Sequence, residues 1–285
     1  MPLVSVKGLR FHYQQKGQGP DVVLIHAATS NLAVWVFIGL IDTLAADFRV
    51  TAYDLRGHGL SDVPPTGYTS ADHAADFRAL HEALGLGPAY LVGHSFGAVV
   101  ATHAAVLYPE KVAGLVLSDC YFPGLAHVEP NLHQSAVWQE VKGVLGRCGV
   151  DLGEEVDFTR LFHAAAALTP AQKEQVRRES GPGSLRWLGQ LPRLAPTTCG
   201  ADMFAVAGLT AERIGSVGQP VVALYDEHTP FAATRGYLEG HLSDLTVDTV
   251  PGARHVAPLQ SSADFVRLVQ RHLLALRDRP RQAQG

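Results

Sequence analysis

The chain has 285 residues, of which 47% are hydrophobic and 18% charged, so it can bury a full core without disulfides or metals. Its 23 Lys and Arg and 27 Asp and Glu residues give a formal net charge of −4, which together with the lack of a basic cluster before the tail argues against a nucleic-acid partner. Three widely spaced cysteines give no disulfide framework and no paired Cys/His zinc pattern. No secretory signal pattern and no apolar window of about 18 residues is present, so no membrane partner and a cytoplasmic location are expected.

The first half of the chain alternates between strand and helix patterns. Residues 9–15 and 21–26 are predicted strands separated by a KGQGP turn, and a predicted helix over 33–46 precedes the apolar strand RVTAYD. The next helix is predicted to start with Ser70 as its N-cap and to stop at Gly85. The pattern continues with a strand over 89–92, a helix over 97–108 and a strand over 112–117. Such alternation predicts βαβ units in a mostly parallel sheet covered on both faces.

The alternation stops between residues 122 and 217. No convincing strand pattern occurs there, and helices are predicted for four amphipathic stretches, 136–147, 158–167, 170–179 and 201–208. It then resumes with a strand over 221–225, a helix over 232–241, a strand over 245–250 and a helix over 263–276. We therefore expect one α/β core, residues 1–121 and 218–285, interrupted by a helical cap, residues 122–217.

The sequence Gly93-His94-Ser95-Phe96-Gly97 lies between a predicted strand and a predicted helix. A serine at such a turn has a strained backbone, and small residues two positions before and after it avoid clashes. The turn raises the hydroxyl above the sheet edge and directs the next backbone N–H to the same place. This context favours Ser95 as a nucleophile.

A serine nucleophile needs a base within hydrogen-bonding distance. Fourteen histidines are available, so composition cannot select one. His255 follows the last predicted strand, at the carboxyl edge of the sheet where Ser95 is also expected. Its position therefore makes His255 the predicted base.

With these motifs, the chain resembles the α/β-hydrolase fold family, specifically small esterase and lactonase-like members with a helical lid. The matching stretches are VVLIHA, YDLRGHGLSD, YLVGHSFGA, GLVLSD and VPGARH, in family order. The resemblance implies a mostly parallel eight-stranded sheet flanked by helices, an inserted helical cap, a Ser–acid–His triad and an oxyanion hole. It implies no metal and no organic cofactor.

The triad acid departs from the family pattern. In most of the family it follows the strand after the lid, where this chain has Thr229, and a threonine cannot stabilise an imidazolium. Asp119, at the end of the strand before the lid, is the first alternative, because some relatives carry their acid there. Asp226 is the second, and Glu227 the third.

The oxyanion loop departs as well. The family usually has His-Gly after the third strand, and this chain has His26-Ala27-Ala28. By position, the backbone N–H groups of Ala28 and Phe96 are the expected oxyanion donors, and the methyl group of Ala27 is expected to be tolerated.

These residues predict a serine hydrolase that cleaves a hydrophobic carboxylic ester or lactone through an acyl-enzyme, as a monomer or homodimer. Three aromatic residues of the cap are the expected substrate contacts, namely Trp138, Phe162 and Trp187. Two alternatives stay open. One is a carbon–carbon bond hydrolase or a lyase with the same residues, and the other is a non-catalytic ligand-binding protein whose triad is impaired.

Overall fold

The computed structural model describes residues 2–180 and 183–279, with the side chains of 180 and 183–188 left undescribed. In these ranges, eight strands form one sheet in the order β1-β2-β4-β3-β5-β6-β7-β8. The strands are β1 (Leu3–Val6), β2 (Leu9–Lys16), β3 (Asp21–Ile25), β4 (Arg49–Tyr53), β5 (Ala89–His94), β6 (Val112–Ser118), β7 (Val221–Asp226) and β8 (Leu245–Val250). Strands β3 to β8 are parallel to one another, and β1 and β2 are antiparallel to their neighbours. The predicted mostly parallel, eight-stranded sheet is confirmed.

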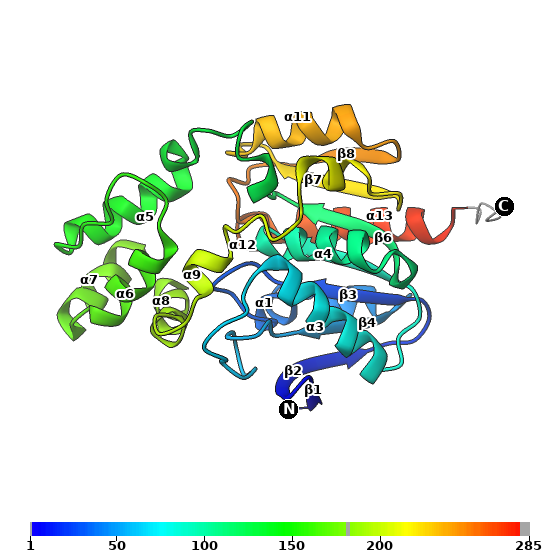
Figure 1. Ribbon diagram of the computed structural model, residues 1–285, viewed down its shortest axis with the longest axis horizontal. Helices are drawn as coiled ribbons and strands as arrows, with labels where there is room; N and C mark the ends of the chain where they lie inside the picture. The colour runs from blue at the N-terminus through cyan, green and yellow to red at the C-terminus, as the bar shows by residue number, and fades with distance from the viewer. Residues whose placement is uncertain (1, 181–182, 280–285) are drawn as a thin grey trace.

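Helices cover both faces of this sheet. They include α1 (Ala33–Phe37), α2 (Leu40–Leu44), α3 (Ser70–Ala83), α4 (Phe96–Leu107), α11 (Ala232–His241), α12 (Ala257–Gln260) and α13 (Ser262–Arg277). One apolar core packs α3 and α4 against the sheet, and a second packs α2 and α13 against the opposite face. Figure 1 looks onto the face with α3 and α4, with the β1–β2 hairpin at the bottom edge and β8 at the top. The continuous apolar strands are explained by these two cores.

Two local predictions need correction. The helix predicted over 33–46 is two short helices, because Gly39 between them has φ 73°, a conformation that ends a helix. The N-cap of α3 is Thr69 rather than Ser70, and Thr69 and Asp72 bond each other's backbone in a capping box. Strand β1 was not predicted, because four alternating residues at a sheet edge carry little signal.

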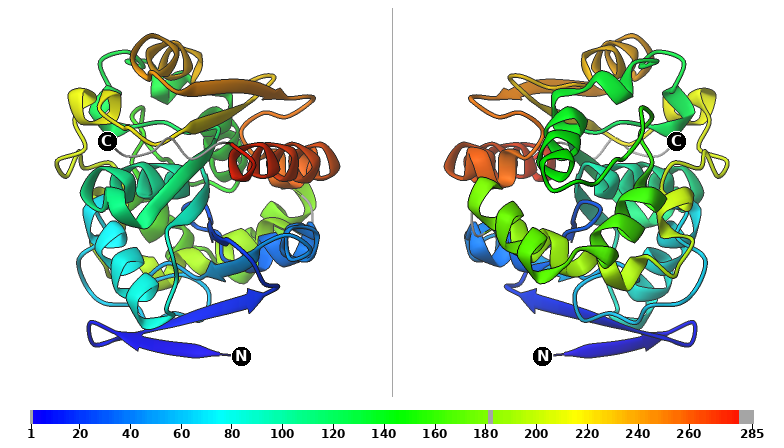
Figure 2. Two further views of the ribbon diagram at one scale, coloured as in Figure 1. Left: turned by 90° about the vertical axis from the view of Figure 1, so that its right-hand side faces the viewer. Right: turned by 90° about the vertical axis from the view of Figure 1, so that its left-hand side faces the viewer.

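Only helices and loops occupy the described residues between β6 and β7. Their helices are α5 (Ala136–Arg147), α6 (Phe158–Ala167), α7 (Pro170–Ser180), α8 (Gly183–Leu194), α9 (Cys199–Asp202) and α10 (Ala211–Gly215). Helices α5 to α8 lie beyond one end of the strands in Figure 1 and in front of the sheet in the right-hand view of Figure 2. The helix expected over 201–208 is wrong, because α9 ends at Asp202, and α8 was not predicted.

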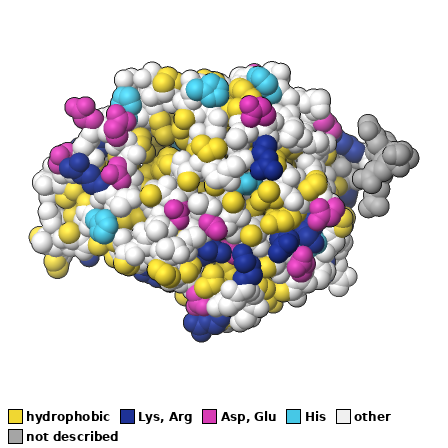
Figure 3. Space-filling view, viewed as in Figure 1, with side chains coloured by type: hydrophobic (Ala, Val, Ile, Leu, Met, Phe, Trp, Pro, Cys, Tyr) yellow, Lys and Arg dark blue, Asp and Glu magenta, His cyan; other side chains and the backbone are white. Residues whose placement is uncertain are grey.

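No helix in the described ranges has both the length and the apolar character that a bilayer-spanning segment needs. On the face seen in Figure 3, Lys and Arg side chains lie among Asp and Glu side chains, with apolar surface between them. This face therefore carries no extended patch of one charge.

Candidate active site

Ser95 occupies a sharp turn between β5 and α4, with φ 52° and ψ −118°. The two glycines of the motif permit this turn. A Cβ atom on Gly93 would lie 2.4 Å from the carbonyl oxygen of Gly97, and one on Gly97 would lie 2.2 Å from that of Ile25. Because neither position has room for a methyl group, the glycines allow the strand and helix to approach closely enough to raise the Ser95 hydroxyl above the sheet edge.

A hydrogen-bonded chain joins Ser95, His255 and Asp119. The hydroxyl oxygen of Ser95 lies 3.2 Å from Nε2 of His255. Nδ1 of the same imidazole lies 2.7 Å from Oδ2 of Asp119. The three residues follow β5, β8 and β6, which are parallel and end at the same edge of the sheet. A nucleophile, its base and the acid that orients the base would need contacts of this kind.

The other carboxylates left open by the sequence make different contacts. Oδ2 of Asp226 accepts the backbone N–H of His255 at 2.6 Å, rather than the imidazole. Oε2 of Glu227 accepts the backbone N–H of Gly252 at 2.7 Å. The hydroxyl of Thr229 accepts the N–H of Phe231, so it only closes a turn. The geometry thus favours Asp119 as the partner of the imidazole.

Residues with strained backbone conformations are concentrated at this site. Six described residues other than glycine have positive φ, and four of them are here, namely Thr29, Ser95, Asp119 and His255. The values at Asp119 and His255 are 40° and 101°. Such conformations are held only where surrounding contacts enforce them, and they concentrate at functional sites.

The two residues expected to supply oxyanion donors, Ala28 and Phe96, both line the cavity that contains Ser95. Phe96 is the first residue of α4, so its N–H has no partner within the helix. Ala28 lies in the loop after β3 and lines the same cavity as Ser95. In the described chain, neither N–H donates a hydrogen bond to another protein group. Both sequence-predicted oxyanion donors are therefore available.

Two buried histidines hold the loop that carries Ala28. Nε2 of His58 accepts the backbone N–H of Thr29 at 3.1 Å, and Nε2 of His26 accepts that of Leu55 at 3.0 Å. Burial lowers the pKa of both rings, and that of His58 to about 3, so each stays neutral and can accept. The sequence analysis did not assign this role. The signal for it in the sequence is one histidine in each of two motifs, His26 in VVLIHA and His58 in YDLRGHGLSD.

The two rings beside His255, those of His94 and Phe231, are uncharged near neutral pH. Burial, and the nearby imidazole of His255, lower the pKa of His94 to about 3. The His94 ring lies 5.6 Å from the His255 ring, and the edge-on ring of Phe231 lies 5.0 Å away on another side. Desolvation and the charge of Asp119 raise the pKa of Asp226 to about 7.

Ser95 and His255 open into a cavity of about 810 Å³. The core contributes Ala28, Phe96 and Phe231, and the inserted helices contribute Trp138, Phe158 and Phe204, among others. No Lys, Arg, Asp or Glu side chain is among the residues that the structure describes around it. A cavity of this size and apolar character fits a small organic molecule.

The three aromatic residues expected to contact substrate differ in position. Trp138 lines the cavity. Phe162 does not, because it is buried among the inserted helices with its ring 5.9 Å from that of Phe158, which does line the cavity. The side chain of Trp187 is outside the described residues.

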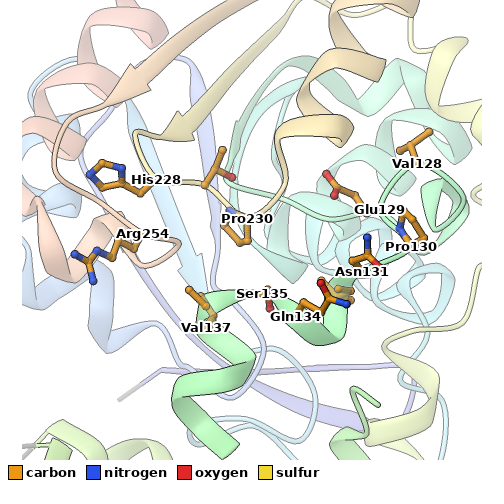
Figure 4. A pocket seen from close by; sticks show the side chains of 13 residues that line it. Val128, Glu129, Pro130, Asn131, Gln134, Ser135, Val137, His228, Pro230 and Arg254 are labelled. Carbon is orange, nitrogen blue, oxygen red and sulfur yellow. The ribbon is translucent and has the colours of Figure 1, made fainter. Parts of the chain in front are cut away.

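A second cavity of about 410 Å³, drawn in Figure 4, lies beside the first. Segment 128–137 forms one wall, and the loops at 228–230 and Arg254 form the other. Oε1 of Glu129 accepts the backbone N–H of Thr234 at the start of α11, so this carboxylate is already bonded. Leu132, Ser135 and Val137 line both cavities, which makes this segment the partition between them. Among the described residues, no group of His, Cys, Asp or Glu side chains is arranged to hold a metal ion.

Comparisons with known proteins bear on the family and the fold of this chain. A family model described as alpha/beta hydrolase fold matches residues 20–145. A 2-(acetamidomethylene)succinate hydrolase from Mesorhizobium japonicum is 32% identical over 259 residues, 88% of this chain and 87% of that protein. A pimeloyl-acyl-carrier-protein methyl ester esterase from Chromobacterium violaceum is 31% identical over 263 residues, 90% of this chain and 95% of that one. The solved enol-lactonase of Burkholderia xenovorans LB400 gives a TM-score of 0.69 at 19% identity, covering 96% of this chain and 100% of that one.

Proposed function

Since this chain belongs to the α/β hydrolase fold family, we propose that it is a serine hydrolase that cleaves an uncharged carboxylic ester or lactone through an acyl-enzyme on Ser95. The observation that carries the proposal is the contact chain from the Ser95 hydroxyl through the His255 imidazole to the Asp119 carboxylate. All three groups are in hydrogen-bonding distance without any further movement.

The reaction runs in two halves. Oγ of Ser95 attacks the carbonyl carbon while Nε2 of His255 takes the hydroxyl proton. The tetrahedral intermediate collapses, the carbon–oxygen bond to the leaving group breaks, and the imidazolium returns its proton to the departing oxygen. Water then repeats these steps on the acyl-enzyme, with His255 again as base, and releases the acid. Asp119 holds the ring in the tautomer that presents a free Nε2 and stabilises its charged form.

The N–H groups of Ala28 and Phe96 donate hydrogen bonds to the carbonyl oxygen as negative charge develops on it. Loss of one such donor typically lowers the rate by about 10²–10³-fold. The hydrogen bond from Thr29 to the neutral His58 ring supports the loop in which Ala28 lies. The extra methyl of Ala27 is compatible with this arrangement, because Ala27 lines the cavity and its carbonyl accepts the N–H of Ser30 in a regular turn.

The cavity supports an apolar, uncharged substrate. The relatives named above are a hydrolase of a succinate derivative and an esterase of an acyl-carrier-protein ester. A dicarboxylate substrate needs cationic or hydrogen-bonding partners, and the described lining has no Lys or Arg side chain. Exposed apolar residues at the cavity, chiefly Phe37 and Leu259, extend the apolar surface outward. An ester or lactone with an aliphatic or aromatic group fits this surface better than an anion.

We assign residues 122–217 as a lid over a core of residues 1–121 and 218–285. Support comes from the composition of the cavity wall, to which Trp138 and Phe158 contribute from the inserted helices, opposite Ser95 from the core. A lid of this kind excludes water while the carbonyl is attacked, which strengthens the electrostatic contacts inside.

Intact-mass labelling with a small fluorophosphonate tests the proposal. Wild type should gain one label, Ser95→Ala none, and Asp119→Asn should label at least about 10²-fold more slowly because the tautomer of His255 is no longer held. Asp62→Asn is the matched control, since it removes a carboxylate that pairs with Arg10 at the surface. A wild-type protein that takes no label, or a Ser95→Ala protein that labels equally, contradicts the assignment.

Product analysis separates the two remaining alternatives. A carbon–carbon bond hydrolase would use the same residues on a vinylogous diketone, so turnover of that substrate with inertness toward esters would replace the ester assignment. A binding protein with an impaired triad would take no label and still bind an apolar ligand. The hydrogen bond between Asp119 and His255 argues against an impaired triad, because it gives the imidazole a carboxylate partner although position 229 is a threonine.

A further inference from the structure

Asp226 is a second buried carboxylate that the proposed mechanism does not use. It ends β7 beside Asp119, and its side chain is 1% exposed. One oxygen, Oδ2, accepts two backbone N–H groups, from His255 at 2.6 Å and from Ala257 at 3.2 Å. These residues begin the segment that leads into α12. The carboxylate therefore ties the loop after β8 to the end of β7.

The contacts form a closed ring of three residues. Oδ1 of Asp119 accepts the backbone N–H of Asp226 at 3.0 Å. Oδ2 of Asp226 accepts the backbone N–H of His255, and Nδ1 of His255 returns to Oδ2 of Asp119 at 2.7 Å. Loss of the Asp226 side chain leaves the contact between Asp119 and the His255 ring but frees the backbone of His255. Each carboxylate thus fixes a different part of His255, Asp119 its ring and Asp226 its backbone.

We propose that Asp226 is a positioning residue for the base, holding the strained backbone of His255 so that its imidazole reaches both Asp119 and Ser95. This inference rests on the proposed function, because it concerns the same base. His255 has φ 101°, a strained conformation for a residue with a side chain, which needs contacts that enforce it. The two hydrogen bonds to Oδ2 of Asp226 are those contacts.

Asp226 also places a titratable charge next to the base. Its other oxygen, Oδ1, is buried and has no partner among the described residues. The groups that face this carboxylate are Asp119 from β6 and His255 from the loop after β8. The remaining titratable side chains of these loops are exposed, namely Glu227, His228 and Arg254. Once ionised, the Asp226 carboxyl therefore places a second negative charge beside His255.

Two substitutions separate position from charge. In Asp226→Asn, the amide oxygen still accepts both backbone N–H groups, so the turn persists and only the charge is lost. In Asp226→Ala, the acceptor is lost and two N–H groups near the base have no partner. Glu227→Gln is the matched control, because this neighbour is exposed and bonds Gly252 instead.

We would measure kcat and KM for 4-nitrophenyl acetate between pH 5 and 9 and record the proton spectrum of the His255 Nδ1–H. We expect Asp226→Ala to lower kcat about 10²-fold at every pH, with KM nearly unchanged, because a base misplaced by about 1 Å loses that much. We expect Asp226→Asn to retain kcat within about threefold at pH 8. Its pH profile of kcat/KM should differ from that of wild type only from about pH 7 upward, where the wild-type carboxyl is ionised. The Nδ1–H resonance should persist in Asp226→Asn and broaden or vanish in Asp226→Ala.

Full kcat in Asp226→Ala would overturn the proposal, and so would equal losses in both variants with an unmoved pH profile and a persistent Nδ1–H resonance. Measurement of the wild type distinguishes failure of the positioning role of Asp226 from failure of the proposed hydrolase function. If wild type hydrolyses no ester, the hydrolase assignment fails, and the proton resonance alone still decides whether Asp226 positions the ring.

Discussion

Replacing Asp226 by asparagine changes the charge of a buried side chain and leaves its size, so the effect on stability should depend on pH. In the folded protein the pKa of this carboxyl is raised from 3.8 to about 7 by burial and by Asp119. Below pH 4 the carboxyl is protonated in the folded and the unfolded chain alike. Between pH 4 and 7 the unfolded chain releases this proton and the folded protein keeps it, so wild type loses stability as the pH rises.

The magnitude follows from the shift. Each pKa unit corresponds to about 1.4 kcal/mol, so the rise from 3.8 to about 7 corresponds to a loss on the order of 4 kcal/mol by pH 8. Because the shift includes the interaction with Asp119, it belongs to the pair, and this figure is an upper bound for Asp226 alone. The asparagine variant lacks this loss. Its amide nitrogen replaces an oxygen that has no partner, which costs about 1–3 kcal/mol at all pH values.

Urea unfolding followed by fluorescence at pH 4.5, 6 and 8 measures the difference. Relative to wild type, Asp226→Asn should be equal or less stable at pH 4.5 and should gain stability steadily toward pH 8, with an unchanged m-value. Glu227→Gln should give a nearly flat difference, because this neighbour is exposed. A flat difference for Asp226→Asn, or one that falls as the pH rises, would refute the reasoning about the buried charge.

Three further predictions concern the turn, the cavity opening and a buried ion pair. Gly97→Ala should lower the free energy of unfolding by at least about 2 kcal/mol in urea titrations and abolish labelling, because its methyl group would lie 2.2 Å from a carbonyl oxygen at the end of β3. The double change Phe37→Ser and Leu259→Ser should lower kcat/KM for 4-nitrophenyl octanoate several-fold and leave the acetate unchanged, since about 0.8 kcal/mol is lost for each methylene left in water. Equal losses on both esters would contradict that contact. Arg56→Met should destabilise the fold by about 3–5 kcal/mol in thermal melts, because Asp76 is 1% exposed and would keep only Lys7, at 3.6 Å, as a cationic partner.

The strands were predictable because each lies in a short apolar run between turn residues. All seven predicted strands occur, and the missed β1 is a four-residue edge strand in which exposed and half-buried residues alternate. The helices between β6 and β7 were harder. Helix α8 was missed because Pro192 lies inside it and two glycines precede that proline, features that ordinarily argue against a helix.

The site could be predicted as far as local motifs reach. Ser95 is marked by its glycines, and His255 by its place after the last strand. The sequence ranked Asp119 before Asp226 without deciding between them, because both follow neighbouring parallel strands that end at one edge. The backbone conformation and the contacts in the structure distinguish the two carboxylates. Asp119, at φ 40°, reaches the imidazole, while the side chain of Asp226 is bonded to the backbone of His255 and Ala257.

The adjacency of β6 and β7 also explains how two carboxylates can serve one histidine. Neighbouring strands lie about 4.8 Å apart, so a side chain at the end of either one can reach the loop that follows β8. With Thr229 unable to hold an imidazolium, the ring depends on the carboxylate of β6 and the backbone on that of β7. Burial raises the pKa of Asp226 to about 7, and the nearby charge of Asp119 contributes to the rise. With both carboxylates present, His255 is held at its ring by Asp119 and at its backbone by Asp226. Loss of either carboxylate should therefore lower the reactivity of Ser95.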